Sequence, residues 1–182
     1  MKRNTKDLLI ESAMSEFMEC GYRKSSVRRI CEKAGVTTGA LYFFFKDKDD
    51  LLSCVVNGPL TKFEEIIGNH FEKIDISFLI EELISLYYRY QEEFTILLHR
   101  SEGSAYENVV DRIVELLELK NGELAERLKG IKADPFIIHW ISHEQISAFL
   151  NLTEHCKSED EALIKAKTLQ KYLTAGWQAA LF

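Results

Sequence analysis

Residues 26–45 read SVRRICEKAGVTTGALYFFF, and this stretch predicts two short helices joined by a tight turn. Ser26 is a natural N-cap for a first helix over 27–33, which Gly35 stops. Thr37 then caps a second helix that begins at Thr38 and ends near Phe45. These lengths are typical of a helix-turn-helix, whose second helix enters the major groove of DNA.

The two faces of that second helix differ in chemistry. Helical periodicity places Leu41, Phe44 and Phe45 on one side, where they can pack on the preceding helices. The other side carries a hydroxyl, a glycine and two aromatic rings, which suits a major groove better than solvent. The three phenylalanines could instead all be core, and we assign only Phe44 and Phe45 to it. The residues expected to face DNA are Thr38, Gly39, Tyr42 and Phe43.

The rest of the chain predicts helices almost throughout, because apolar residues recur at helical spacing and no strand pattern occurs. A helix over 5–20 ends at Gly21, which supplies a left-handed residue. Asp47 caps a fourth helix, in which Pro59 predicts a kink or break near residue 58. Further helices are expected over 76–90, 94–100, 106–128 and 135–155, the last after the favoured start Asp134-Pro135, and from the capping box of Ser158 and Glu161 onward.

Charge is distributed unevenly along a chain whose net charge is −6. Residues 1–48 hold ten Lys and Arg against six Asp and Glu, whereas residues 49–182 hold thirteen against twenty-three. A basic head on an acidic body suggests that one end of the molecule meets phosphates. Chance is the alternative, because the surplus is modest, and Arg28 and Arg29 could be an ordinary solvated face.

Three ordered features carry a resemblance to a known family. They are an amphipathic helix from Leu9 to Gly21, the run SSVRRICEKAGV over 25–36 and the run TTGALYFFFKDKDDLL over 37–52. Over roughly the first 55 residues they resemble the N-terminal domain of the tetracycline-repressor (TetR) family. The resemblance implies an all-α fold with a three-helix DNA-binding domain over 1–50 and a helical effector-binding and dimerisation domain over 51–182. It also implies a dimeric repressor that leaves palindromic operator DNA when a small-molecule effector binds.

The resemblance assigns DNA contacts to matching positions only. The helix that starts at Ser26 approaches the DNA backbone, and Lys48 clamps a phosphate at the start of the fourth helix. The chain departs from the family pattern at Phe44, which is often histidine, at Cys31, which is often alanine, and at Arg29, which is often an acid. The implied DNA-binding positions are Ser26, Val27, Arg28, Thr37, Thr38, Gly39, Tyr42, Phe43 and Lys48.

The last helix carries a stripe of small and apolar residues at alternating spacings of four and three, as in closely packed helices. With the helix over 135–155 it could form a four-helix bundle with a second copy, which resembles the usual dimer of the family. The alternative is that the stripe faces the core of its own chain. It consists of Ala162, Ala166, Leu169, Leu173, Gly176 and Ala180.

Aromatic residues are dense in the acidic body and could line a cavity for an apolar or aromatic effector, although such residues are more often core. His139 and His143 lie one helical turn apart and could share a metal. Trp140 follows the first histidine where a zinc-protease motif needs glutamate, so neither a metal nor a cofactor is expected. The candidate effector residues are Tyr87, Tyr90, Phe94, Tyr106, Trp140 and His143.

The remaining features narrow the class of protein. The four cysteines form no CxxC pair and suggest small hydrophobic residues in a reducing compartment. Without an apolar window that could cross a bilayer or a secretory signal, we expect a cytoplasmic protein with no membrane partner. No histidine, cysteine or carboxylate set has catalytic spacing, so an all-helical enzyme is the weaker alternative. A second alternative is a helix-turn-helix adaptor controlled by a protein partner.

Overall fold

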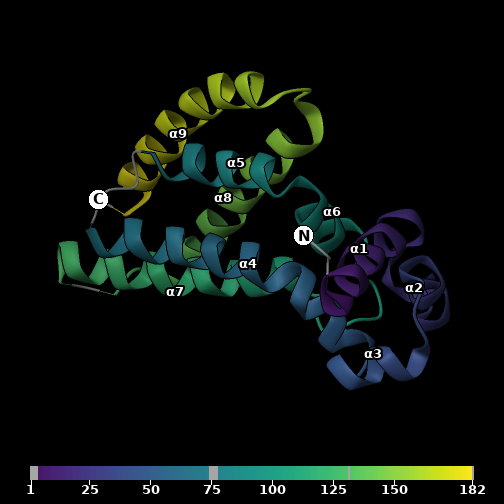
Figure 1. Cartoon of the computed structure of the whole chain (residues 1–182). Helices are drawn as coiled ribbons and strands as arrows, with labels where there is room; N and C mark the ends of the chain where they lie inside the picture. The colour runs from purple at the N-terminus through teal and green to yellow at the C-terminus, as the bar shows by residue number, and fades with distance from the viewer. Residues whose placement is uncertain (1–3, 74–77, 131, 182) are drawn as a thin grey trace. The chain divides into compact units, whose positions relative to one another are not determined.

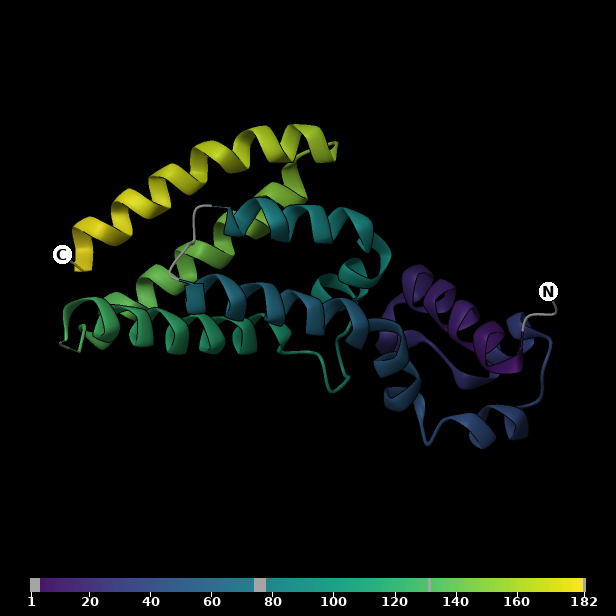
Figure 2. The same ribbon diagram turned by 60° about the vertical axis from the view of Figure 1, so that its left-hand side comes forward.

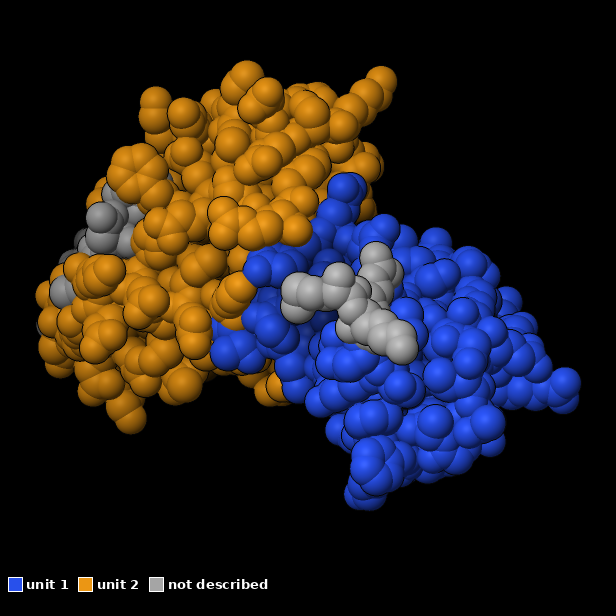
Figure 3. Space-filling model, in the orientation of Figure 1, with its two compact units in different colours: residues 1–61, 90–109 blue, residues 62–89, 110–182 orange. Residues whose placement is uncertain are grey.

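The structure is a computed structural model that describes residues 4–73, 78–130 and 132–181. These residues form helices and short loops without a strand, which confirms the all-α prediction (Figure 1). They divide into two compact units, coloured separately in Figure 3. Unit 1 comprises residues 1–61 and 90–109, and unit 2 comprises residues 62–89 and 110–182. The units therefore do not divide at residue 50, where the sequence had suggested a boundary.

Unit 1 is built around its first helix. It contains α1 (Thr5–Lys24), α2 (Val27–Ala34), α3 (Thr38–Phe44), the start of α4 (Lys48–Lys73) and α6 (Gln91–His99). Helix α1 packs against α2, α3 and α6, and the contact with α6 explains why residues from the middle of the chain belong to this unit. The core of unit 1 includes the fully buried side chains Leu9, Ala13, Phe17, Ile30 and Leu41.

Helix α1 extends one turn past its expected end. Gly21 has the positive φ that was predicted, 73°, but with ψ at 163° it bends the helix, and a further turn follows to Lys24. At this bend the Tyr22 N–H donates a hydrogen bond of 2.8 Å to the Arg100 carbonyl oxygen. A Cβ added to Gly21 would lie 3.6 Å from that same oxygen, so the positive φ, rather than lack of space, favours glycine here.

Helix α4 runs unbroken through Pro59, so of the expected kink or break near residue 58 the break is wrong, and the kink stays a prediction. A proline inside a helix costs about 3 kcal/mol, because it removes one hydrogen bond and crowds the preceding turn. Val56, Leu60 and Phe63 lie buried on either side of it. Burying a large apolar side chain contributes about 1.5–3 kcal/mol, so three of them outweigh the proline.

Unit 2 consists of the rest of α4 with α5 (Leu79–Arg89), α7 (Val109–Lys129), α8 (Pro135–His155) and α9 (Glu159–Leu181). Helices α4 and α7 lie side by side in both views (Figures 1 and 2), and the Arg127 guanidinium donates to the carbonyl oxygens of Phe71 and Glu72 at 3.3 and 3.2 Å. Helix α5 packs against α8 and α9. Unit 2 is thus a bundle whose elements come from both halves of the chain.

A buried polar cluster joins three helices of unit 2. The Asn121 side chain on α7 donates from Nδ2 to Ser142 Oγ at 3.0 Å and to Gln145 Oε1 at 2.8 Å, both on α8. The Trp177 indole N–H on α9 donates to Asn121 Oδ1 at 3.1 Å. Asn121 and Ser142 have no exposed surface, so separating the three helices would take hydrogen bonds from buried polar groups. The cluster fixes the register of α7, α8 and α9.

Predicted helix ends elsewhere agree to within a few residues. The Asp134 carboxylate accepts from the Phe136 N–H at 2.8 Å, with Pro135 as the first helical residue. Ser158 Oγ accepts from the Glu161 N–H at 3.3 Å, as the capping box predicted. The start of the helix expected over 76–90 falls partly on residues 74–77, which lie outside the described residues.

Candidate nucleic-acid interface

The helix pair predicted from residues 26–45 is present with its predicted caps. Ser26 Oγ accepts from the Arg29 N–H at 3.2 Å and caps α2. Thr37 Oγ1 accepts from the Ala40 N–H at 3.2 Å and caps α3. Between the two helices Gly35 adopts the left-handed conformation, with φ 68° and ψ 30°. Each of these turns follows from short-range hydrogen bonding, which is why the sequence alone located them.

The outer face of α3 is exposed and aromatic. Phe43 is 81% exposed and Tyr42 is 58% exposed, beside exposed Thr38 and Gly39. On the opposite face Leu41 is completely buried. A large apolar ring with this much exposed surface is unfavourable in water unless a binding partner covers it. The outer face of α3 therefore has the character of a recognition surface.

Phe44 was expected in the core, but it is 38% exposed, so this expectation is wrong. Helix α3 ends at this residue, and Phe45 leaves it in an extended conformation with φ −132° and ψ 134°. That change turns the Phe45 ring inward, where it is 2% exposed. The Phe44 ring instead packs edge-on against Phe43, with 5.0 Å between ring centroids, and so buttresses the outer face.

A buried carboxylate fastens α2 to α1. Glu16 of α1 is 1% exposed, and its carboxylate lies 2.6 Å from the Arg29 guanidinium and 3.1 Å from the Lys33 ammonium, both on α2. Burial raises the pKa of Glu16, but the hydrogen bonds from Lys33, Arg29 and Cys20 outweigh it, so the pKa lies below its ordinary value. The carboxylate is therefore ionised, and its ion pairs hold α2 against α1.

Arg29 is thus a structural residue. Besides Glu16, its guanidinium donates to the Lys24 carbonyl oxygen at 2.5 Å, at the end of α1. This arginine stands where the family often has an acid, and its use of the buried Glu16 could not be read from the spacing of the two residues. Burial raises the pKa of the Cys20 and Cys31 thiols, which keeps them protonated.

Lys48 has partners within the protein. Its ammonium donates to the carbonyl oxygens of Tyr22 and Ser25 at 2.7 and 3.2 Å, and lies 3.9 Å from the centre of the Tyr22 ring. Burial lowers the pKa of Lys48. An ammonium group has three donors, so two protein bonds leave one for a phosphate. The implied phosphate clamp stays a prediction, and the structure adds a capping role for the same side chain.

The other implied backbone contacts lie at the start of α2. Arg28 is exposed and forms an ion pair of 2.8 Å with Glu32, one turn further along. Ser26 and Val27 are half-buried, and Thr37 is exposed. A phosphate at this position would compete with Glu32 for the Arg28 guanidinium.

The predicted dimer stripe is divided between the inner side of α9 and positions that reach the surface. Ala162 and Ala166 have no exposed surface and pack inside unit 2, as the alternative interpretation proposed. Leu169 and Leu173 are half-buried, Gly176 is exposed, and the side chain of Ala180 lies outside the described residues. Large apolar residues are instead exposed elsewhere on α8 and α9: Phe136, Trp140, Ile164 and Tyr172, with exposed fractions of 70, 51, 71 and 62%.

The candidate effector residues do not converge. Tyr90, Phe94 and Tyr106 belong to unit 1, Tyr87 is buried in unit 2, and Trp140 and His143 are exposed on α8. Tyr106 donates instead to Asn57 Oδ1 at 2.6 Å. The number of aromatic residues in a sequence carries no information on where they lie in the fold, so the sequence could not show that these belong to different units.

Unit 2 contains a small apolar cavity that the sequence did not reveal. Its volume is about 30 Å³, and it is lined by apolar side chains of α4, α5, α7, α8 and α9. Two amides, Gln145 and Gln170, also reach it. A volume of this size has room for about one or two water molecules.

Among the helices that the structure describes, none is long and apolar enough to cross a bilayer. An exposed recognition surface on the second helix of such a pair, in an all-helical chain, defines a helix-turn-helix protein. Residues 9–55 match the family described as "Bacterial regulatory proteins, tetR family". This N-terminal segment therefore carries the similarity to the TetR family.

Named relatives agree with this assignment. The HTH-type transcriptional regulator HbdR of Aromatoleum sp. (strain CIB) is 30% identical over 102 residues, which are 53% of this chain and 44% of HbdR. The HTH-type transcriptional repressor BepR of Brucella suis biovar 1 (strain 1330) is 30% identical over 122 residues, 62% of this chain and 58% of BepR. The chain thus spans about half the length of these relatives. Both are named as regulators and not as enzymes, in agreement with the prediction.

The fold extends the likeness over nearly the whole chain. A transcriptional regulator (TerR/AcrR family) from Aquifex aeolicus VF5 superposes with a TM-score of 0.72 at 22% identity, covering 93% of this chain and 99% of that chain. At this identity the likeness concerns the fold.

Proposed function

We propose that the chain is a ligand-responsive transcriptional repressor that binds palindromic operator DNA as a dimer. The observation that carries this proposal is the outer face of α3, where Phe43 and Tyr42 are exposed while Leu41 on the opposite face is buried. A phenylalanine ring in the major groove contacts the methyl group of thymine, and a tyrosine hydroxyl reaches phosphate or base edges. Gly39, which is exposed beside them, lets the backbone approach the DNA closely.

Two copies are needed to read a palindrome, because each recognition helix covers one half-site. Support for a dimer comes from the exposed apolar residues of α8 and α9. Ile164 and Tyr172 lie two helical turns apart, with exposed Thr168 midway between them, so they form one stripe along α9. Covering this stripe with the same helices of a second copy would remove it from water. In this proposal the interface lies on the exposed side of α9 that carries Ile164 and Tyr172, and Ala162 and Ala166 are core.

The effector site of this proposal is the apolar cavity of unit 2. A drug-sized ligand occupies about 300–1,000 Å³, so at about 30 Å³ the cavity belongs to a ligand-free conformation. A ligand that binds only an opened conformation shifts the population toward that conformation. The affinity for DNA then changes if the open and closed conformations bind DNA with different strength. The lining predicts an apolar effector with one or two polar atoms facing Gln145 and Gln170.

Selection of bound duplexes from a random pool tests the central claim. We expect an enriched palindrome bound by the wild type, and a loss of discrimination in Phe43→Ala and Tyr42→Ala. Phe78→Ala removes a ring that is 57% exposed in unit 2 and serves as the matched control. Equal enrichment by the wild type and Phe43→Ala would contradict the assigned face. Release of the selected duplex by small apolar molecules supports the effector, whereas release only by a protein partner supports the adaptor alternative.

A further inference from the structure

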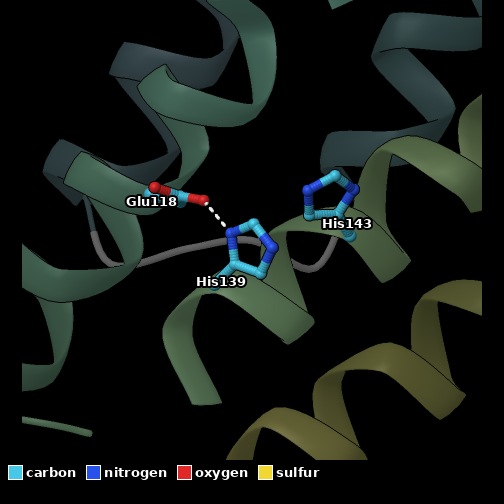
Figure 4. Close-up of side chains that lie close together, drawn as sticks. All are labelled: Glu118, His139 and His143. Carbon is cyan, nitrogen blue, oxygen red and sulfur yellow. Dashed lines mark hydrogen bonds and ion pairs between the residues drawn. The ribbon is translucent and has the colours of Figure 1, made fainter. Parts of the chain in front are cut away.

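Two histidines and a carboxylate meet on the surface of unit 2, outside the proposed DNA surface. His139 and His143 project from adjacent turns of α8, and Glu118 projects toward them from α7 (Figure 4). His139 Nδ1 lies 2.6 Å from Glu118 Oε1, and the two imidazole rings are 4.4 Å apart between centroids. The potential ligand atoms of the three residues all lie within 4.8 Å of one another.

We propose that Glu118, His139 and His143 form a binding site for a divalent transition-metal ion of the zinc type. Imidazole nitrogens with one carboxylate oxygen are the ligands of three-residue zinc sites, which leave the fourth position to water. Zn²⁺ lies about 2.0–2.2 Å from such atoms, so tetrahedral ligand atoms are about 3.4 Å apart. The observed separations bracket that value, and small side-chain rotations at the surface bring the three atoms to it.

An ordinary ion pair accounts for only part of this arrangement. It explains the contact of Glu118 with His139, but it assigns no role to the His143 ring, which lies beside His139 with 60° between the ring planes. Neutral histidines one turn apart on a helix are suited to chelate one ion from the same side. A carboxylate from the neighbouring helix completes the set.

The backbone beneath the site is held rigidly. One turn after Glu118, Asn121 of α7 donates to Ser142 and Gln145 of α8, which follow His139 and His143 by three and two residues. These bonds are buried, so the distance between the two helices at the site is set without the metal. A site that needs no backbone movement loses less of its binding free energy to ordering.

No metal was expected at these histidines because Trp140, and not the glutamate of a hydrolytic motif, follows His139. Binding an ion needs no catalytic glutamate, and the carboxylate that matters lies 21 residues before His139. A pattern within one helix does not show that the carboxylate and the histidines lie close together, because α7 and α8 meet only in the folded protein.

Titration of the full chain with Co²⁺, a spectroscopic substitute for Zn²⁺, tests the proposal. We expect one equivalent to bind with the visible absorption of a four-coordinate nitrogen and oxygen site. We expect the affinity for Co²⁺ to fall at least about tenfold in each of His143→Gln, His139→Gln and Glu118→Gln. Removing a group that only supports a metal ligand already costs about 10–100-fold. His99→Gln and His155→Gln, which change histidines outside the cluster, should leave the affinity unchanged.

A second measurement separates binding from an effect on folding. His143 is exposed, so its variant should keep the wild-type helical circular dichroism. Zn²⁺ should raise the thermal midpoint of the wild type but not of His143→Gln, because an ion bound to the native state stabilises it. Equal affinity of wild type and His143→Gln overturns the proposal, as does Co²⁺ absorption from thiolate ligands that disappears in a cysteine variant.

Discussion

The ammonium group of Lys48 lies 2.7 Å from the carbonyl oxygen of Tyr22 and 3.9 Å from the centre of the Tyr22 ring. Lys48 is the first residue of α4, and Tyr22 lies in the last turn of α1, where carbonyl groups lack helical partners. The lysine therefore closes the end of one helix from the start of another. Its proposed contact with a phosphate would use the donor that remains.

Replacing Lys48 should consequently affect stability as well as DNA binding. In Lys48→Met the Ser25 carbonyl loses the lysine donor and the Tyr22 carbonyl keeps only the Ser25 N–H and hydroxyl, so we expect the free energy of unfolding to fall by about 1–3 kcal/mol. Urea unfolding of the free protein measures this. Lys46→Met, which changes an exposed lysine two residues earlier, is the control. Unchanged stability of Lys48→Met would show that the two bonds contribute little.

Glu16→Gln should destabilise unit 1. The substitution keeps the shape of the side chain but removes the charge that Arg29 and Lys33 share, and we expect a loss of about 1–3 kcal/mol. Glu19→Gln is the matched control, because Glu19 pairs with the same Lys33 at 2.7 Å from an exposed position. Exposed ion pairs contribute about 0–1 kcal/mol. Equal losses in the two variants would contradict the special role of the buried carboxylate.

The same carboxylate gives the stability a definite dependence on pH. Because the pKa of Glu16 is lowered in the folded protein, the unfolded chain takes up a proton first, near the ordinary glutamate pKa of about 4.3. Its contribution is complete above that pH and is lost as the pH falls through the lower, folded pKa. Unfolding free energies measured from about pH 7 to pH 3 should therefore fall less steeply in Glu16→Gln than in the wild type. Parallel curves would rule this out.

Arg28 offers a test of the backbone contacts. We expect Arg28→Ala to weaken binding to all duplexes alike and to lower the salt slope of the binding constant by about 1. Glu32→Gln removes the carboxylate that competes for the same guanidinium, so it should tighten binding. Arg89→Ala, an exposed arginine in unit 2, is the control for lost positive charge. Identical slopes for wild type and Arg28→Ala would remove this residue from the interface.

The proposed dimer predicts a contrast between two faces of α9. Ile164→Arg places a charge on the exposed stripe and should yield folded monomers, which sedimentation velocity detects. Leu119→Arg alters a leucine that is 57% exposed on α7 and should remain dimeric. Ala166→Leu overfills a site with no free surface and should instead cost about 1–3 kcal/mol of stability. A dimeric Ile164→Arg protein would refute the proposed interface.

Local chemistry explains which parts of the fold could be predicted. The caps at Ser26, Thr37 and Asp134 and the turn at Gly35 depend on hydrogen bonds to residues two to four positions away. The exposed ring of Phe43 followed from helical periodicity. Such signals are complete within a few residues of sequence, so they do not depend on the rest of the fold.

Tertiary packing explains what could not be predicted. Pro59 lies within an unbroken helix because buried neighbours outweigh its local cost. The register of α9 was ambiguous because small residues such as Ala166 suit either a core or an interface. The cavity and the Glu118 cluster combine side chains from different helices, and the periodicity of one helix does not report its distance from another.

The cluster centred on Asn121 determines how the cavity of unit 2 can grow. Helices α7, α8 and α9 share its buried bonds, so separating them would break the bond from Asn121 to Ser142 or the bond from Trp177 to Asn121. Helix α5 lies outside this cluster, and at the cavity wall its Ile80 N–H donates to Gln170 Oε1 at 3.3 Å. A guest with its own carbonyl oxygen can take over that N–H. If the cavity opens to admit an effector, we therefore expect α5 to move while the Asn121 cluster keeps α7, α8 and α9 together.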